Sequence, residues 1–369
     1  MTAPKTLRDL DDLGVSIWLD DLDRSRIESG NLAELVRTRA VKGVTTNPSI
    51  FHKAISSGGA AYADDLAALA AAGVDVDAAI RRLTTDDVRN ACDIMRGVWD
   101  ATEGVDGRVS IEVDPRLAHD TEGTIAQARE LWSIVDRPNL LIKIPATKAG
   151  LPAITEVIGS GISVNVTLIF AVARYREVVD AYMQGLKLAK ANGHDLSTIH
   201  SVASFFVSRV DTEVDARLDA IGSDAAKAVR GKAALANARL AWEAHLDFMA
   251  DPEWQGLTVA GARPQRPLWA STGVKDPSYD DTRYVIDLAV RGCVNTMPEP
   301  TLNAVADHGV FAGDTISYVI GEAAEVWRDL AVFDIDAAEV CEKLEVNGVQ
   351  QFIDAWEALR HSVQEALGS

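Results

Sequence analysis

A single lysine, Lys143, lies in an otherwise apolar stretch, NLLIKIPAT (139–147), whose composition is typical of a buried strand. Burying an ammonium group is costly unless its pKa falls or another group pairs with it. An uncharged lysine amine is a nucleophile that adds to carbonyl carbons. The alternative is a lysine on an edge strand, or one whose stem covers apolar surface while its ammonium group reaches water. Residues on the neighbouring strands must decide between the two.

Polar residues alternate with aliphatic ones in the other predicted strands. Successive side chains of a strand point to opposite faces, so VSIEV (109–113) places Glu112 on one face and only aliphatic residues on the other. Asn165 and Thr167 follow this pattern in and just after ISVNV (162–166), and Asp20 ends VSIWLD (15–20). The polar residues expected to point into the same region as Lys143 are Asp20, Asn47, Glu112, Asn165, Thr167 and Ser204.

Each of these residues also has an ordinary structural explanation when it is taken alone. Asp20 begins DDLDR (20–24), where an acidic residue is suited to capping a helix or to facing solvent. Glu112 would suit an exposed strand, although VSIEV has few polar neighbours. Asn165 and Thr167 would most often be structural hydrogen bonders, and Ser204 alone says little. Their joint position at strand ends is what favours one common site.

Short β-rich segments alternate with alanine-rich amphipathic segments, the pattern of a parallel sheet with crossover helices. Eight such units within about 250 to 300 residues predict an α/β fold, a (β/α)8 TIM barrel, whose active site lies at the carboxyl ends of the strands. The expected strands are 15–20, 41–45, 109–113, 139–144, 162–166, 201–205, 266–270 and 293–296.

Helices are expected between these strands and after the last of them. The ranges are 31–39, 121–135, 170–192 and 280–290, two or three helices within 48–102, a pair within 208–249 broken near Gly222, and 315–330 and 348–367 beyond the barrel. We expect a single domain over 1–369, with the barrel at about 15–300 and a C-terminal helical cap at about 301–369. The cap and the 48–102 insertion receive no catalytic role from the sequence.

A buried lysine with carboxylates around it suits Schiff-base chemistry on a carbonyl substrate. The amine adds to a ketone to give a carbinolamine, and loss of water leaves an iminium that withdraws electrons from a breaking carbon–carbon bond. Each step moves protons, which requires acid and base groups at more than one position. The iminium is itself the electron sink, so no cofactor and no metal are expected.

Composition limits the partners. The chain has 55 acidic and 36 basic residues, a formal charge of −19, which argues against nucleic-acid or anionic-membrane binding. Cys92, Cys293 and Cys341 show neither disulfide-framework nor zinc-ligand spacing. The N-terminus lacks an apolar signal core, and no run reaches the ~18 apolar residues of a membrane helix. We expect a cytoplasmic protein, either a monomer or a homodimer.

The chain resembles the transaldolases, a family of class I Schiff-base aldolases of the non-oxidative pentose phosphate pathway. The resemblance covers about 16–301 and rests most specifically on GVTTNPSIF, LIKIPAT and VNVTLIF, which occur in the family's order. It implies a barrel that acts on sugar phosphates: a dihydroxyacetone unit passes reversibly from sedoheptulose 7-phosphate to glyceraldehyde 3-phosphate, giving erythrose 4-phosphate and fructose 6-phosphate. SIWLDDLDR, VSIEVDPRL, SFFVSRVD, WASTGVKD and VNTMPEPTL continue the resemblance.

The resemblance also implies roles for individual residues. Lys143 is similar to the Schiff-base lysine and Asp20 to the acid/base group that handles the C4 hydroxyl proton. Glu112 and Thr167 resemble a pair that positions a water for carbinolamine formation and dehydration. Arg209 resembles the phosphate-binding arginine, which offers a fixed fork of donors. The positions that would hold hydroxyls of the dihydroxyacetone unit are Asn47, Asn165 and Ser204.

One motif departs from the family. Where the family commonly has ASFR or ASFK, this chain has ASTGVKD, which displaces the second phosphate anchor. Ser271 keeps its place, and Lys275 is the expected cation; the alternative is an exposed loop lysine.

Three other functions compete with this hypothesis. A fructose-6-phosphate aldolase-like enzyme shares the lysine, the first-strand aspartate and the barrel. It typically has Gln in place of Glu112 and Tyr in place of Phe206, so both positions favour transaldolase. A catalytically silent barrel that binds sugar phosphates is the second alternative. A metal-dependent aldolase is the third, but it requires clustered histidines, and the 7 histidines of this chain are scattered.

Overall fold

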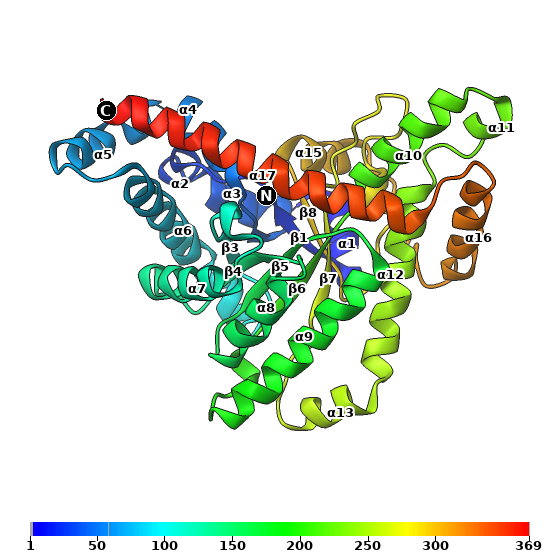
Figure 1. The fold of residues 1–369 in the computed structure, drawn as a ribbon, viewed down its shortest axis with the longest axis horizontal. Coiled ribbons are helices and arrows are strands. Elements are labelled where there is room, and N and C mark those ends of the chain that lie inside the picture. The colour runs from blue at the N-terminus through cyan, green and yellow to red at the C-terminus, as the bar shows by residue number, and fades with distance from the viewer. Residues whose placement is uncertain (1–2, 58, 369) are drawn as a thin grey trace.

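The computed structural model describes residues 3–57 and 59–368. Within this part of the chain eight parallel strands close into a barrel in sequence order, with β1 paired to both β2 and β8 (Figure 1). The strands are β1 (Ser16–Leu19), β2 (Val41–Val44), β3 (Arg108–Glu112), β4 (Leu140–Pro145), β5 (Val164–Ile169), β6 (Ser201–Phe206), β7 (Arg266–Ala270) and β8 (Val294–Met297). The predicted (β/α)8 barrel is confirmed.

Helices cover the outside of the barrel and extend beyond it. The first group is α1 (Lys5–Leu13), α2 (Arg24–Glu28), α3 (Asn31–Arg39), α4 (Pro48–Ser57), α5 (Gly59–Ala71), α6 (Val76–Ala101), α7 (Thr121–Val135), α8 (Gly150–Gly159) and α9 (Val172–Ala191). The second is α10 (Ser208–Ile221), α11 (Asp224–Lys227), α12 (Ala233–Ala250), α13 (Pro252–Val259), α14 (Arg283–Ile286), α15 (Glu299–His308), α16 (Ile320–Ala331) and α17 (Ala337–Leu367). Two 3₁₀ turns are η1 (Pro115–Leu117) and η2 (Leu196–Thr198).

The predicted helices 31–39 and 121–135 have the bounds of α3 and α7. The helix predicted over 280–290 is mostly wrong, because only α14, Arg283–Ile286, is helical there. The helix does not continue because Thr315 binds the backbone at Ala289. Thr315 Oγ1 accepts from the Ala289 amide at 3.0 Å, and the Thr315 amide donates to the Ala289 carbonyl at 2.9 Å. These two hydrogen bonds take the place of the backbone hydrogen bonds that a longer helix would form at Ala289. The helix predicted over 315–330 begins later, at Ile320, and the one predicted over 348–367 begins earlier, at Ala337.

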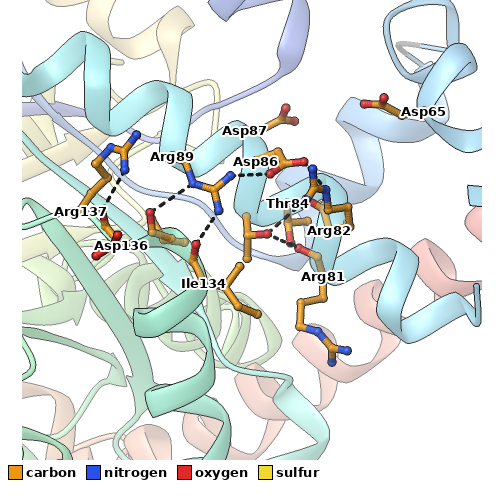
Figure 2. A network of polar contacts seen from close by, with 12 residues as sticks. Asp65, Arg81, Arg82, Thr84, Asp86, Asp87, Arg89, Ile134, Asp136 and Arg137 are labelled. Carbon is orange, nitrogen blue, oxygen red and sulfur yellow. Dashed lines mark hydrogen bonds and ion pairs between the residues drawn. The ribbon is translucent and has the colours of Figure 1, made fainter. Parts of the chain in front are cut away.

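The 48–102 insertion contains α4, α5 and α6 among its described residues. Figure 2 shows how α6 is joined to the end of α7: Arg89 donates to the Ile134 and Val135 carbonyls and to Asp86 Oδ1, the last at 2.6 Å. A cation at a helix C-terminus satisfies carbonyls that have no partner within the helix. Because α6 and α7 both pack on the β3–β4 side of the barrel, this contact supports the strands that carry Glu112 and Lys143.

A polar cluster fills the amino end of the barrel. Asp106 accepts hydrogen bonds from Ser16 Oγ at 2.6 Å, Trp18 Nε1 at 3.1 Å and Arg266 Nη2 at 3.0 Å. Although burial opposes ionisation, the Arg266 charge and these bonds hold the pKa of Asp106 below its ordinary value. The Trp18 ring needs the space beside Gly43, where an added Cβ would lie 2.4 Å from it. The interior is therefore packed here, and a cavity is left at the carboxyl end.

The predicted C-terminal helical extension is confirmed. Its long helix, α17, crosses the molecule from α4 and α5 at one end to α10 at the other, and it also contacts β5 (Figure 1). No helix in the described ranges combines the length and apolar character that crossing a bilayer requires.

Candidate active site

A cavity of about 260 Å³ opens at the carboxyl ends of the strands. It is lined by most of the residues predicted from the sequence: Asp20, Asn47, Lys143, Thr167, Ser204, Phe206, Arg209, Ser271 and Lys275. The sequence did not single out the other lining residues, which are Thr45, Ser49, Ala270, Gly273, Thr296, Pro298 and Phe352. The predicted residues Glu112 and Asn165 do not line this cavity, but each contacts a residue that does.

Lys143 is buried, and its ammonium group has partners. Its Nζ donates to the Thr46 carbonyl at 2.7 Å and to Glu112 Oε2 at 3.1 Å, and both charged side chains are only 6% exposed. The strand register explains this pairing, because Glu112 of β3 lies directly opposite Lys143 of β4. Since β4 is hydrogen-bonded to β3 and β5, the edge-strand explanation of Lys143 is wrong. A buried amine therefore faces an open cavity with a carboxylate next to it.

Two carboxyl groups flank this amine. Loss of hydration raises the pKa of Glu112 against the opposing charge of Lys143. The same loss raises the pKa of Asp20, although Thr45 Oγ1 donates to its Oδ1 at 2.7 Å. Thr45 is in turn bonded to Thr296 at 2.6 Å. Both carboxyls thus keep a proton to higher pH than usual, which suits groups that exchange protons with a substrate.

We predict that an Asp20→Asn variant is more stable than the wild type, increasingly so as the pH rises. The unfolded chain releases the Asp20 proton near its ordinary pKa of 3.8, whereas the folded chain keeps it to higher pH. Wild-type stability therefore falls as the pH rises from that value through the folded pKa, and Asn removes this titration while it still accepts from Thr45. Calorimetry at about pH 4 and about pH 7 should show the difference in Tm grow to about 1–3 °C. A difference that stays constant or shrinks would contradict the account.

Three predicted hydroxyl-binding residues already make hydrogen bonds within the protein. Ser204 Oγ donates to Asn165 Oδ1 at 2.7 Å, and Asn165 Nδ2 donates to Ser110 Oγ at 3.1 Å, which places the fully buried Asn165 behind Ser204. Asn47 Oδ1 accepts from the Ile50 amide at 3.0 Å and so caps α4. These bonds fix the side chains in position. Within the described ranges the Asn47 amide nitrogen donates to no other residue, so its donors are open to a ligand.

Thr167 lines the same cavity as Lys143, and the backbone next to it is strained. Its buried Oγ1 has no hydrogen-bond partner in the part of the chain that the structure describes. The next residue, Leu168, has a φ of 59°, and the β5–β6 register shifts between Val166 and Ile169. Bulges of this kind redirect side chains at the rims of barrels. A buried hydroxyl that lacks a protein partner and lines a cavity is suited to binding a water or a substrate oxygen.

Two cations, Arg209 and Lys275, also line the cavity. Neither makes a hydrogen bond or an ion pair with any other described residue, and Arg209 lies over the Phe206 ring at 5.3 Å. Burial lowers the pKa of Arg209, and the Asp20 charge opposes this shift. Ser271, with a φ of 55°, lies beside them and is bonded to Ser208 Oγ at 2.9 Å. Unpaired cations in a protein of charge −19 indicate a binding site for an anion.

Lys275 also lines a second cavity, of about 290 Å³, together with Asp276 and Arg230. Its side chain is exposed, in contrast to the half-buried Arg209. Glu112 lines a smaller cavity of about 40 Å³ with Asn47. No group of three or more His, Cys, Asp or Glu residues within the described ranges is arranged to hold a metal ion.

The sequence did not reveal Thr45, which donates to Asp20, Thr296, which is bonded to Thr45, or Phe352, whose ring lies near Lys143. Thr45 belongs to GVTTNPSIF, two residues before the predicted Asn47, so the signal for it was present. Phe352 had no such signal, because its place in the cavity depends on how α17 packs across the barrel. Its ring centroid is 5.9 Å from Lys143 Nζ.

Comparisons with known proteins agree with this geometry. The family model described as Transaldolase/Fructose-6-phosphate aldolase matches residues 17–363. A protein of Mycolicibacterium paratuberculosis named Transaldolase is 60% identical over 371 residues, covering 100% of this chain and 99% of the relative. A Streptomyces coelicolor protein named Transaldolase 1 is 60% identical over 366 residues, covering 98% of this chain and 95% of the relative. The chain belongs to the transaldolase/fructose-6-phosphate aldolase family.

Proposed function

We propose that this chain catalyses the transaldolase reaction, in which a dihydroxyacetone unit passes from a ketose phosphate to an aldose phosphate through a Schiff base on Lys143. The observation that carries the proposal is the position of the Lys143 amine. It contacts the Glu112 carboxyl and shares a cavity with Asp20, and the pKa of both carboxyls is raised; two cations that have no partner among the described residues line the same cavity. The full-length relatives named Transaldolase support the same activity.

The first steps join Lys143 to the substrate. Transfer of a proton from the ammonium group to Glu112, 3.1 Å away, frees the amine to add to the C2 carbonyl. The attacking nitrogen then gives up a proton to the former carbonyl oxygen, which produces a carbinolamine. Return of a proton from Glu112 to that hydroxyl lets it leave as water and produces the iminium. Thr167, whose hydroxyl has no partner among the described residues, is proposed to hold the water involved.

Cleavage follows from the iminium. Asp20 takes the proton of the C4 hydroxyl, the C3–C4 bond breaks, and its electron pair moves toward the iminium nitrogen to form an enamine. The aldose phosphate leaves. An acceptor aldehyde then enters, the enamine carbon attacks its carbonyl, and Asp20 returns the proton to the new C4 oxygen. Hydrolysis of the final iminium releases the ketose phosphate and restores the Lys143 amine.

Arg209 is proposed to bind the phosphate, and Lys275 and Ser271 to assist it. The expected donor and acceptor are sedoheptulose 7-phosphate and glyceraldehyde 3-phosphate, and the expected products are erythrose 4-phosphate and fructose 6-phosphate. A fixed guanidinium fork suits phosphate oxygens. Ser204, Asn165 and Asn47 are proposed to orient the dihydroxyacetone hydroxyls.

A turnover assay separates transfer from simple aldol cleavage. With fructose 6-phosphate and erythrose 4-phosphate together, the enzyme is expected to form sedoheptulose 7-phosphate and glyceraldehyde 3-phosphate steadily. With fructose 6-phosphate alone, product formation should stop after about one turnover, because the enamine waits for an acceptor. Glu112 and Phe206 favour this outcome over a fructose-6-phosphate aldolase. Steady release of dihydroxyacetone without acceptor would refute transfer, and no reaction in either assay would favour a silent barrel.

The acidic charge balance supports a protein that does not bind nucleic acid. The organisation of the chain as one domain, a cytoplasmic location and the choice between monomer and homodimer stay predictions. Size-exclusion chromatography with light scattering would decide the oligomeric state.

A further inference from the structure

The C-terminal helix contributes a residue to the cavity that no sequence motif contains. Phe352, on α17, lines the same cavity as Lys143, and its ring is only 5% exposed. The ring centroid lies 5.9 Å from Lys143 Nζ. The wall that faces the amine from this side is therefore aromatic, whereas the strands supply polar groups from the other sides.

Ion pairs hold α17 to the barrel on both sides of this ring. Toward the start of the helix Lys343 donates to Glu213 Oε1 at 2.7 Å, and toward its end Arg360 donates to Asp77 Oδ1 at 2.8 Å. Glu213 belongs to α10 and Asp77 to α6, elements on opposite sides of the barrel mouth (Figure 1). The segment that carries Phe352 is thus held on both sides, by these two ion pairs among others.

The helix backbone itself lies against the cavity wall. At Gly348, one helical turn before Phe352, an added Cβ would lie 3.1 Å from Leu168 Cδ2 and 3.6 Å from Arg209 Nη1. An added side chain there would crowd Leu168, whereas its distance from Arg209 is an ordinary contact. The absence of a side chain at Gly348 lets α17 approach closely, and the ring at i+4 then enters the cavity on the same face of the helix.

The covalent intermediate of the proposed reaction has two fates, and this inference rests on that proposed function. In transfer, the enamine carbon forms a bond to the acceptor carbonyl carbon. In hydrolysis, that carbon instead takes up a proton from water, a second water adds to the iminium carbon, and the C–N bond breaks. Free dihydroxyacetone leaves and the Lys143 amine is restored. Only hydrolysis needs water beside the adduct while no acceptor is present.

We propose that Phe352 is a specificity-determining residue whose ring excludes water from its own side of the adduct on Lys143, while water held at Thr167 still serves the final hydrolysis, and so favours transfer over early hydrolysis. A water on this side of the amine would face a hydrocarbon surface that offers no hydrogen bond. Attraction between the ring and a cation on the nitrogen adds little, because 5.9 Å is near the limit of that interaction. The volume of the side chain at position 352 therefore determines how well water is excluded.

The test uses a size series, Phe352→Leu, Phe352→Val and Phe352→Ala, in the full-length enzyme. The readout is a ratio: dihydroxyacetone release from fructose 6-phosphate alone, divided by transfer to added erythrose 4-phosphate. We expect the ratio to rise less than about threefold for Leu, further for Val and at least about tenfold for Ala. A ratio does not depend on how much of each variant is folded.

Leu359→Ala is the matched control, because Leu359 is fully buried on the same helix but does not line the cavity. It should lose stability like the Ala variant at 352 and keep the wild-type ratio. A Phe352 series with an unchanged ratio, or a rise for Leu as large as that for Ala, would overturn the inference. If Phe352→Ala does not fold, an unchanged ratio in Phe352→Val overturns it equally. Absence of transfer in the wild type would instead refute the proposed function.

Discussion

Replacing Lys143 with methionine is expected to abolish transfer of the dihydroxyacetone unit. Methionine fills a similar volume but has no amine, so neither the carbinolamine nor the iminium can form. Loss of a covalent nucleophile of this kind lowers kcat by about four orders of magnitude or more. The measurement is the initial rate of sedoheptulose 7-phosphate formation from fructose 6-phosphate and erythrose 4-phosphate.

Lys143→Arg is the matched control for the charge. Methionine leaves Glu112 without its partner, whereas arginine keeps a cation beside that carboxyl and always remains protonated. We expect the arginine variant to fold and to be as inactive as the methionine variant. More than about 1% of wild-type activity in either folded variant would rule out Lys143 as the nucleophile.

The second large effect is expected at the phosphate end of the cavity. Arg209→Leu should lower kcat/KM for erythrose 4-phosphate about 100-fold, or roughly 2.7 kcal/mol, which is the loss expected for one charge-assisted hydrogen bond of roughly 1.5–3 kcal/mol. The loss should be small with unphosphorylated glyceraldehyde as the acceptor, within about threefold, because that molecule has no phosphate to bind. The ratio of the two kcat/KM values isolates phosphate binding from damage to the rest of the site.

A parallel Lys275→Leu variant compares the second cation. Lys275 is exposed and lines two cavities, so we expect a loss of about tenfold, smaller than for Arg209. Equal losses with phosphorylated and unphosphorylated acceptors in the Arg209 variant would contradict its assignment as the phosphate ligand.

The barrel and most of the cavity lining were predictable because the same local pattern specifies both. Strands buried beneath helices need aliphatic residues on one face, and that requirement makes Glu112 and Lys143 stand out in VSIEV and NLLIKIPAT. In a parallel barrel the ends of neighbouring strands meet, so polar residues at those ends gather in one place. The register of β3 with β4 follows from the same topology.

What could not be predicted depends on contacts between distant segments. The helix expected over 280–290 ends early because Thr315 bonds the backbone at Ala289. The start of α17 was misplaced at Gly348, since glycine usually marks a helix end; here it is the point where the helix touches Leu168. The C-terminal extension received no role from the sequence, because Phe352 reaches the cavity only through contacts between α17 and distant segments.

Reductive trapping tests the central claim most directly. The enzyme is incubated with fructose 6-phosphate and treated with borohydride. Protonation of the waiting enamine carbon gives an iminium, which borohydride reduces to a stable amine, and the modified peptide is then identified by mass spectrometry. The account predicts one adduct, a reduced dihydroxyacetone unit on the peptide that contains Lys143, together with loss of activity in proportion to labelling. An adduct on another lysine, or no adduct in an enzyme that is turning over, would contradict it.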